Sequence, residues 1–358
     1  MDFTKTIGGK QTALYTMRNK SGAVCSLTNY GGALVEILVP DRDGKLANVV
    51  QGHDNIDSVI NSPEPFLSTL VGRFGNRIKE GRFSLDGTQY RLAINNGPNH
   101  LHGGPTGFHA RVWDVLEHDD HTVLLQYVSA DMEEGFPGEL TVKVRFTWTD
   151  GNELIIDYHA TTSKPTVVNL THHAFISLQG IGTPTKDIHS QILQVNADRY
   201  LPIDENSIPL PSAPASVEGT PFDFRSPKPV GQDLNVDADL NANENGNDDI
   251  QLRIANGYDH CFVINGEGLR LAARVTEPVS GRVVECYTTE PGVQVYTHNW
   301  ADGFAGYGGA TFGRRSAIAL EAQHFPDSPN RPDFPSVVLR PGEEYTQQTI
   351  YKFGITNN

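Results

Sequence analysis

The stretch LTVKVRFTW at residues 140–148 gives the strongest indication of the fold. Apolar or aromatic residues occupy every second position, with Thr, Lys and Arg between them, which is the two-residue period of a half-buried β-strand. The pair Asp150 and Gly151 follows, and LIIDYH at 154–159 is again rich in β-branched and aromatic residues. Two strand-like runs around an Asp-Gly turn predict an antiparallel hairpin.

The same pattern recurs on both sides of this hairpin. Short runs such as VLLQY at 123–127 and VVECY at 283–287 lie between Gly, Asp and Asn turn signals, and an Asp86–Gly87 pair marks another predicted turn. Helical periodicity is not sustained over three turns, and no linker or internal repeat divides the chain. The sequence therefore predicts an all-β fold, a large antiparallel β-sandwich in which residues 1–358 form a single domain.

Composition and charge narrow the range of partners. The formal net charge of −15 disfavours nucleic acid and anionic membrane surfaces, so a neutral small molecule fits best. No apolar run approaches the roughly 18–20 residues of a membrane span. Residues 1–20 lack the apolar stretch of a signal peptide, so a cytoplasmic protein is expected. The three cysteines form no CxxC pair, which predicts buried reduced thiols at Cys25, Cys261 and Cys286.

Residues 231–249, GQDLNVDADLNANENGNDD, form a strongly polar and acidic segment. Such composition predicts an acidic surface loop. Its alternating Asp and Asn residues resemble an EF-hand calcium loop, but Ala242 stands where that loop requires Gly, and Asp248 stands where it requires Glu. An EF-hand is therefore not expected.

Two Gly-rich segments carry candidate ligand-binding side chains. In GRFGNRI at 72–78, two arginines flank a Gly–Asn pair; a guanidinium group could clamp a hydroxylated ligand there, and the alternative is a pair of surface arginines on a turn. In NHLHGG at 99–104, His100 and His102 would share one face of a strand, which suits a metal pair but lacks an obvious third ligand. The Gly–Gly pair indicates a sharp turn or a close backbone approach.

Adjacent histidines occur in VVNLTHHAFISL at 167–178. On a strand, neighbouring side chains point to opposite faces. His172 shares its face with mostly apolar residues, whereas His173 shares its face with more polar ones. His173 is therefore the better candidate for an acid or a base, and His172 is expected to be a structural histidine.

Two further segments place carboxylates in or beside strands. In GYDHCF at 257–262, either Asp259 or His260 could face a ligand, and the alternative is that Asp259 only caps a turn. In AIALEAQHFP at 317–326, Glu321 interrupts an apolar strand whose small Ala side chains leave room for a ligand. Apolar surroundings raise the pKa of a carboxyl group, as a general base near neutrality requires.

Together these groups favour proton transfer on a neutral polyhydroxylated molecule. The chain has no GxSxG motif, no cysteine in a recognisable catalytic context, no evident zinc ligand set and no phosphate-binding loop. Sugar ring opening requires a base for the proton of the anomeric hydroxyl and an acid for the ring oxygen. Neither a metal nor a cofactor is expected.

Eight ordered segments of the sequence resemble the aldose 1-epimerase (galactose mutarotase) family. The resemblance covers roughly residues 10 to 353 and implies a β-sandwich of the galactose-mutarotase type that interconverts the α and β anomers of free aldohexoses such as galactose and glucose. The matching segments are NYGGALVEILVPDRDGK (29–45), GRFGNRIKEGRFSLDG (72–87), NHLHGG (99–104), EEGFPGEL (133–140), VNLTHHAF (168–175), GYDHCF (257–262), TTEPGVQVYTHN (288–299) and LEAQHFPDSPNRPDFPSVVLRPGEEY (320–345).

The resemblance also implies roles for individual residues. By motif match, Glu321 is similar to the family's general base on the anomeric hydroxyl, and His173 to its general acid at the ring oxygen. His102, in LHGG, is similar to a second histidine close to the ring oxygen. Four further residues are implied to bind the sugar: Asn76, Arg77, Asp259 and Gln294.

Two departures and three alternatives accompany this hypothesis. The family often has Asn where His172 stands and Gly where His298 stands. A hexose-6-phosphate epimerase would need basic residues for the phosphate, a glycoside hydrolase would use two carboxylates such as Glu321 and Asp259, and a non-catalytic sugar-binding protein would need neither acid nor base. The expected partner is a monosaccharide, and the expected state is a monomer or weak dimer.

Overall fold

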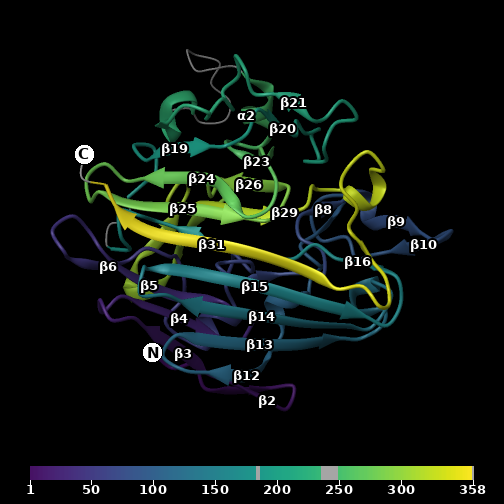
Figure 1. Ribbon diagram of the computed structural model, residues 1–358, viewed down its shortest axis with the longest axis horizontal. Helices are drawn as coiled ribbons and strands as arrows, with labels where there is room; N and C mark the ends of the chain where they lie inside the picture. Colours follow the sequence, from purple (N-terminus) through teal and green to yellow (C-terminus); the bar gives the residue numbers. More distant parts are fainter. Residues whose placement is uncertain (183–185, 235–248, 357–358) are drawn as a thin grey trace.

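The computed structural model in Figure 1 describes residues 1–182, 186–234 and 249–356. Strands dominate, and the strand pairs within the described sheets are antiparallel, so the all-β prediction is confirmed. None of the helices in these ranges has both the length and the apolar character that a membrane crossing requires. The helical elements are α1 (Ile56–Ile60), α2 (Ile250–Ile254) and the 3-10 turns η1 (Lys79–Gly81), η2 (Phe108–Ala110), η3 (Glu133–Gly135), η4 (Val230–Asp233), η5 (Tyr307–Gly309) and η6 (Ser328–Asn330).

The largest sheet has nine strands, whose long members cross the front of the molecule in Figure 1. Its order is β12 (Asp114–His118), β13 (Thr122–Ser129), β14 (Leu140–Trp148), β15 (Glu153–Thr162), β31 (Tyr345–Ile355), β25 (Arg282–Thr288), β24 (Arg270–Thr276), β19 (Ile192–Val195) and β22 (Lys228–Pro229). The C-terminal strand β31 (yellow) lies between β15 and β25, so the last strand of the chain joins the two halves of this sheet.

Both predicted Asp-Gly turns form hairpins. The stretch LTVKVRFTW is β14, and residues 149–152 connect it to β15, with Trp148 paired to Leu154. Asp86 and Gly87 form the two-residue loop between β9 (Arg82–Leu85) and β10 (Thr88–Arg91). Their φ values of 49° and 80° are both left-handed, as a type I′ turn requires.

Two smaller sheets pack against the nine-stranded sheet. The six-stranded sheet has the order β18 (Phe175–Ile176), β29 (Ile318–Gln323), β26 (Gly292–Tyr296), β23 (Asp259–Val263), β20 (Arg199–Tyr200) and β21 (Ala215–Ser216). The four-stranded sheet consists of β3 (Leu14–Arg18), β4 (Val24–Thr28), β5 (Leu34–Pro40) and β6 (Leu46–Asn48).

One hydrophobic core lies between these layers. It extends along the chain from Met17 to Phe353 and includes Phe146 of the nine-stranded sheet and Leu320 of the six-stranded sheet. Burying each such side chain contributes roughly 1.5–3 kcal/mol before entropy losses are counted. Polar links add to the core, since the Tyr351 hydroxyl donates to the carbonyl of Leu320 at 2.7 Å. The sandwich prediction is confirmed.

Besides the β9–β10 hairpin, the described residues form further short two-stranded sheets, and two of them carry site segments. The pairs are β1 (Lys5–Ile7) with β2 (Lys10–Thr12), β7 (Leu70–Val71) with β17 (Thr171–His172), β8 (Arg77–Ile78) with β11 (His100–Leu101), β16 (Thr166–Val167) with β30 (Val338–Leu339), and β27 (Asp302–Ala305) with β28 (Thr311–Gly313). All three cysteines are buried and free, as predicted.

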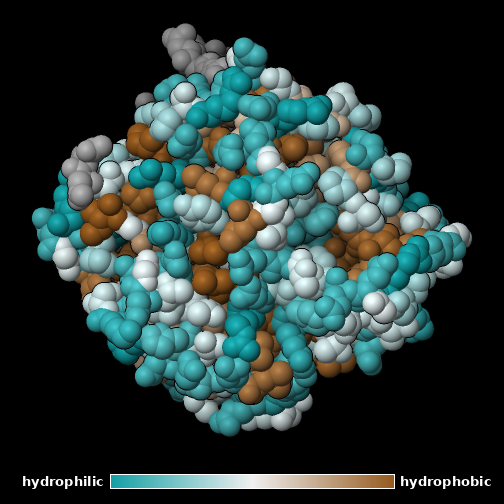
Figure 2. Space-filling model, viewed as in Figure 1, coloured by the Kyte–Doolittle hydropathy of each residue, from teal (hydrophilic) through white to brown (hydrophobic). Residues whose placement is uncertain are grey.

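The acidic segment falls mostly outside the described residues, because 235–248 are not among them. At its C-terminal flank, the Asp249 carboxylate accepts hydrogen bonds from the backbone of Gln251 (2.8 Å) and Leu252 (3.3 Å) and caps α2. Figure 2 shows a mostly hydrophilic surface on the viewed face, with apolar residues in separate small groups.

Candidate active site

Glu321 lies on the face of β29 that points away from the main core. Ile318, Leu320 and Ala322 belong to that core, so strand alternation directs Glu321 to the opposite face of the six-stranded sheet. This face is covered as well, and Glu321 is only 2% exposed. Its Oε2 atom is buried and has no hydrogen-bond partner within the described part of the chain. A buried oxygen of this kind is available to a ligand.

Neighbouring strands place further polar groups on the same face. Gln294 of β26 pairs with Glu321 of β29, and Asp259 of β23 pairs with Tyr296 of β26. The Gln294 side-chain amide donates to Asp259 Oδ1 at 2.6 Å. Three predicted site residues therefore lie side by side on the outer face of one sheet.

The structure decides between the two candidates in GYDHCF. His260 is fully buried on the inner side of β23, where its ring packs against Phe222 at a centroid distance of 4.5 Å. Burial lowers the pKa of His260 to about 3. Asp259, the neighbouring residue, therefore faces the site, as strand alternation requires.

His172 is a core residue, as its sequence context predicted. It pairs with Leu70 through β17 and β7, its Nε2 lies 3.2 Å from the carbonyl oxygen of Gly32, and its ring is 5.9 Å from that of Phe146. Burial lowers the pKa of His172 to about 4, so the ring is neutral at pH 7.

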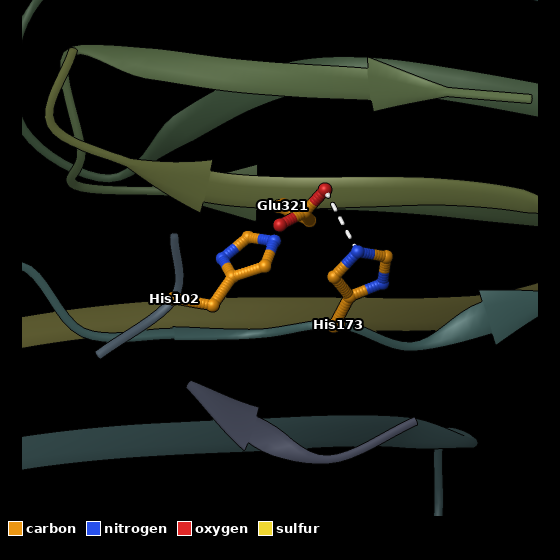
Figure 3. Close-up of side chains that lie close together, drawn as sticks. All are labelled: His102, His173 and Glu321. Atoms are coloured by element: carbon orange, nitrogen blue, oxygen red, sulfur yellow. Dashed lines mark ion pairs between the residues drawn. The ribbon is translucent and has the colours of Figure 1, made fainter. Parts of the chain in front are cut away.

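His173 points the other way, toward Glu321. Its backbone N–H donates to the carbonyl of Thr69 at 2.9 Å, and its ring stacks on Phe175 at 4.6 Å. Figure 3 shows His173 Nε2 directed at Glu321 Oε1, 3.4 Å away. Burial lowers the pKa of His173 to about 3. The parity prediction that separated these two histidines is confirmed.

The predicted common face of His100 and His102 is wrong. The strand β11 ends at Leu101, and His102 has a left-handed φ of 52°, so alternation stops there. His100 bonds through Nδ1 to the carbonyl oxygen of Ala93, whereas His102 turns toward His173 at a ring distance of 5.4 Å.

The Gly–Gly pair that follows His102 explains this turn. A Cβ atom on Gly103 would lie 1.9 Å from the carbonyl oxygen of Gly72, which no side chain tolerates. Gly103 also has a left-handed φ of 81°. The close backbone approach that the sequence indicated is confirmed, and it brings NHLHGG against GRFGNRI.

A backbone hydrogen bond fixes the protonation of His102. The Asn76 N–H donates to His102 Nδ1 at 3.0 Å, so Nδ1 is an acceptor and Nε2 carries the proton in the neutral ring. Burial is the main reason that the pKa of His102 is held well below its usual value. His102 is therefore a neutral N–H donor at pH 7.

The same bond opposes a metal at this site. One ligand atom each from His102, His173 and Glu321 lies within 4.8 Å of the others, a spacing that a divalent cation could use. A histidine that ligates a metal, however, normally donates its second N–H to a neighbouring acceptor. His102 Nδ1 instead accepts, which leaves a protonated Nε2 facing the other two groups. The geometry suits a hydrogen-bond donor better than a ligand.

The two arginines of GRFGNRI have different roles. Arg73 is 2% exposed, and its guanidinium donates to the carbonyl oxygens of Pro137 and Gly138, both at 2.7 Å. The surface alternative is therefore wrong for Arg73, which is an internal cross-link. Arg77 reaches the site, where Nη2 lies 3.7 Å from Asp259 Oδ2 and Nε donates to Asn96 Oδ1 at 2.9 Å.

Charge and burial set the proton affinity of Glu321. Burial raises the pKa of Glu321 well above its usual value, the negative charge of Asp259 raises it further, and Arg77 lowers it. Glu64 adds a smaller upward effect, and its own pKa is raised to about 7 by burial. Glu321 and His173 are thus shifted in opposite directions, so that a single shared proton favours Glu321.

Three residues near the site were not identified by the sequence analysis, namely Glu64, Phe66 and Tyr296. The ring of Phe66 packs on His102 at 4.7 Å, and the ring of Tyr296 lies 5.9 Å from that of His173. Glu64 lies two residues before Phe66 in an irregular segment without periodicity. Tyr296 alone could have been found by strand parity, because it lies two residues after Gln294 on β26.

The chain is similar to known proteins of one family. The family model "Aldose 1-epimerase" matches residues 13–352. Galactose mutarotase of Bos taurus is 42% identical over 333 residues, which cover 92% of this chain and 90% of the relative. Aldose 1-epimerase of Escherichia coli K12 is 36% identical over 349 residues, 96% of each chain. Among solved structures, an aldose epimerase homologue from C. elegans has a TM-score of 0.86 at 31% identity, covering 97% of this chain and 100% of the homologue. The chain belongs to the aldose 1-epimerase family.

Proposed function

We propose that this protein is an aldose 1-epimerase, an isomerase that interconverts the α and β anomers of free aldohexoses such as galactose and glucose. The observation that carries the proposal is the contact between Glu321 and His173, in which a buried carboxylate with an unpartnered Oε2 lies 3.4 Å from an imidazole. Relatives named galactose mutarotase and aldose 1-epimerase, at 42% and 36% identity, support it.

In the proposed reaction, Glu321 accepts the proton of the anomeric hydroxyl. The electron pair of that O–H bond forms the C1 carbonyl, and the bond between C1 and the ring oxygen breaks. His173 delivers its proton to the ring oxygen. The Nε2–H of His102 hydrogen-bonds to the same ring oxygen, which gains negative charge as its bond to C1 breaks. Rotation about the C1–C2 bond and reversal of the same steps close the ring on the other face of the aldehyde.

The opposite pKa shifts explain how one proton serves both groups. Before reaction the shared proton is on Glu321, and its transfer to His173 creates a carboxylate base and an imidazolium acid without exchange with solvent. Ring opening then restores the starting protonation states, with Glu321 protonated and His173 neutral. The pair therefore needs no cofactor or metal for this step.

The remaining polar groups are proposed to bind the sugar hydroxyls. They are Asn76, Arg77, Asp259 and Gln294, of which the Arg77 and Asp259 side chains are 13% and 14% exposed. The positive charge of Arg77 is already balanced by Asp259. A neutral sugar therefore fits this site better than a hexose 6-phosphate, which would require an uncompensated cation.

We also propose that residues 1–358 form one domain that acts in the cytoplasm as a monomer or weak dimer, without nucleic acid or membrane as partners. The core cluster that extends from Met17 to Phe353, the three free cysteines and the net charge of −15 support these points. Light scattering across a concentration series measures the oligomeric state.

The deciding experiment is polarimetry of freshly dissolved α-D-galactose and α-D-glucose with and without the protein. The wild type should accelerate equilibration above the spontaneous rate, and Glu321→Ala should abolish the acceleration. Acceleration with glucose 6-phosphate alone would replace the proposal by the phosphorylated alternative. Sugar binding without any acceleration would instead identify a binding protein.

A further inference from the structure

The buried side chain of Asn169 connects the two segments that build the catalytic site. It is fully buried, and its Oδ1 accepts from the backbone N–H of His324 at 2.9 Å. Its Nδ2 donates to the carbonyl oxygen of Gly75 at 3.0 Å and to that of His324 at 3.3 Å. One amide therefore links the loop of GRFGNRI to the segment that follows β29.

The backbone of Asn169 strengthens the same connection. Its N–H donates to the carbonyl of Arg73 at 3.1 Å, and its carbonyl accepts from the N–H of Gly75 at 2.7 Å. The loop is thus held on both sides of Phe74, directly before the residues that reach the site.

Each linked segment orients a reacting group. On the loop side, Gly75 precedes Asn76, whose N–H fixes the tautomer of His102. On the strand side, His324 lies three residues after Glu321. A shift of either anchor would change the separation between the base and the imidazole donor.

We infer that Asn169 is a positioning residue that sets the distance between Glu321 and His102. All three side-chain hydrogen bonds of Asn169 go to protein backbone, so it acts through other residues and not on the sugar. The inference rests on the proposed function. Misplacement of reacting groups by 1 Å can lower a rate by about 10²-fold.

The chain offers a matched control in Asn29, which is 3% exposed and belongs to a different part of the fold. Asn29 Oδ1 accepts from the backbone of Ala13 at 2.9 Å, and Nδ2 donates to the carbonyl oxygens of Gln11 (3.1 Å) and Trp113 (3.0 Å). Its substitution removes the same number and kind of hydrogen bonds as substitution of Asn169.

The test compares Asn169→Ala with Asn29→Ala at a temperature where both are folded. Both variants should lose similar stability against urea, but only Asn169→Ala should lower kcat, by at least about tenfold, with a smaller change in KM. Equal kcat values for the two variants would overturn the inference. Asn169→Ser, whose hydroxyl is too short to reach both anchors, repeats the test should the Ala variant fail to fold.

A second measurement separates this inference from the proposed function. The ¹⁵N chemical shift of His102 Nδ1 reports its hydrogen bond from Asn76 whether or not the protein epimerises a sugar. This signal should move in the Asn169 variants and stay unchanged in Asn29→Ala. An unmoved signal overturns the positioning role, whereas a wild type without epimerase activity overturns only the function.

Discussion

Strand β14 in the nine-stranded sheet alternates buried and part-exposed residues, whereas β29 and β26 in the six-stranded sheet are buried at every position. Both sheets contribute one face to the shared core. The second face of the nine-stranded sheet meets solvent at positions such as Lys143, but the second face of the six-stranded sheet is covered and carries Glu321 and Gln294.

The difference shows that the same strand alternation gives an outer face exposed to solvent in one sheet and a covered polar face in the other. On the outer face of β14 in the nine-stranded sheet, polar side chains such as Lys143 are exposed to solvent. On the covered face of the six-stranded sheet, Glu321 and the His173 ring that faces it are desolvated, so that burial moves the pKa of Glu321 up and that of His173 down. Stability should therefore depend mainly on the inner face, and activity on the covered outer face.

The largest effect is expected from Glu321→Gln. Loss of the base should lower the catalysed rate by about 10²–10⁴-fold in the polarimetric assay. Because the folded-state pKa of Glu321 is raised, its favourable contribution is present below the unfolded pKa of about 4.3 and is lost as the pH rises through the folded pKa. Gln should therefore become more stabilising relative to wild type between pH 4.5 and pH 8. Urea unfolding of both proteins at these two pH values measures the change, and a stability difference that stays constant would contradict the prediction.

The adjacent histidines test the two faces within one segment. His173→Asn should lower kcat by about 10²–10⁴-fold, because the proton donor to the ring oxygen is lost. His172→Asn should leave kcat close to the wild-type value and instead cost about 1–3 kcal/mol of unfolding free energy, since a buried hydrogen-bonded ring is replaced. Steady-state polarimetry measures kcat and urea unfolding measures the stability of both variants. A loss of kcat in His172→Asn with little loss in His173→Asn would contradict the prediction.

A substitution in the inner face of the nine-stranded sheet should give the opposite signature. Ile156→Ala in β15 removes a fully buried side chain from the core and should cost about 2–5 kcal/mol of unfolding free energy. The folded variant should keep its kcat and KM, because Ile156 lies in the shared core, whereas Glu321 lies on the face of β29 that points away from it. Differential scanning calorimetry measures the loss of stability, and an activity assay at 20 °C measures kcat and KM. A fall in kcat would show that the two faces are coupled.

The last prediction extends the comparison to the pH dependence of stability. Burial lowers the pKa of His100, His109 and His172 to about 4 each. Since the folded-state pKa is depressed, the stability that each neutral ring contributes is complete above about pH 6.5 and is lost as the pH falls toward 4, by up to about 1.4 kcal/mol per pH unit. Urea unfolding at pH 7.5, 6 and 5 should show this loss, and His172→Asn should reduce its slope.

Much of the fold and part of the site followed from local pattern. The alternation in LTVKVRFTW predicted β14, and the Asp-Gly pairs predicted two hairpins. Strand parity separated His173 from His172, and the small residues around Glu321 indicated room for a ligand. Parity fails where backbone dihedrals leave the extended region, which is why the shared face predicted for His100 and His102 was wrong.

The sequence by itself determined which residues alternate across each strand, because that period is a property of the local backbone. Only the tertiary structure decided that Arg73 binds buried carbonyls while Arg77 meets Asp259, and that Phe66 covers His102. These outcomes depend on contacts between segments far apart in the chain. The desolvation that shifts the pKa of Glu321 is likewise a property of the packed molecule, since no single strand can exclude water from its own side chains.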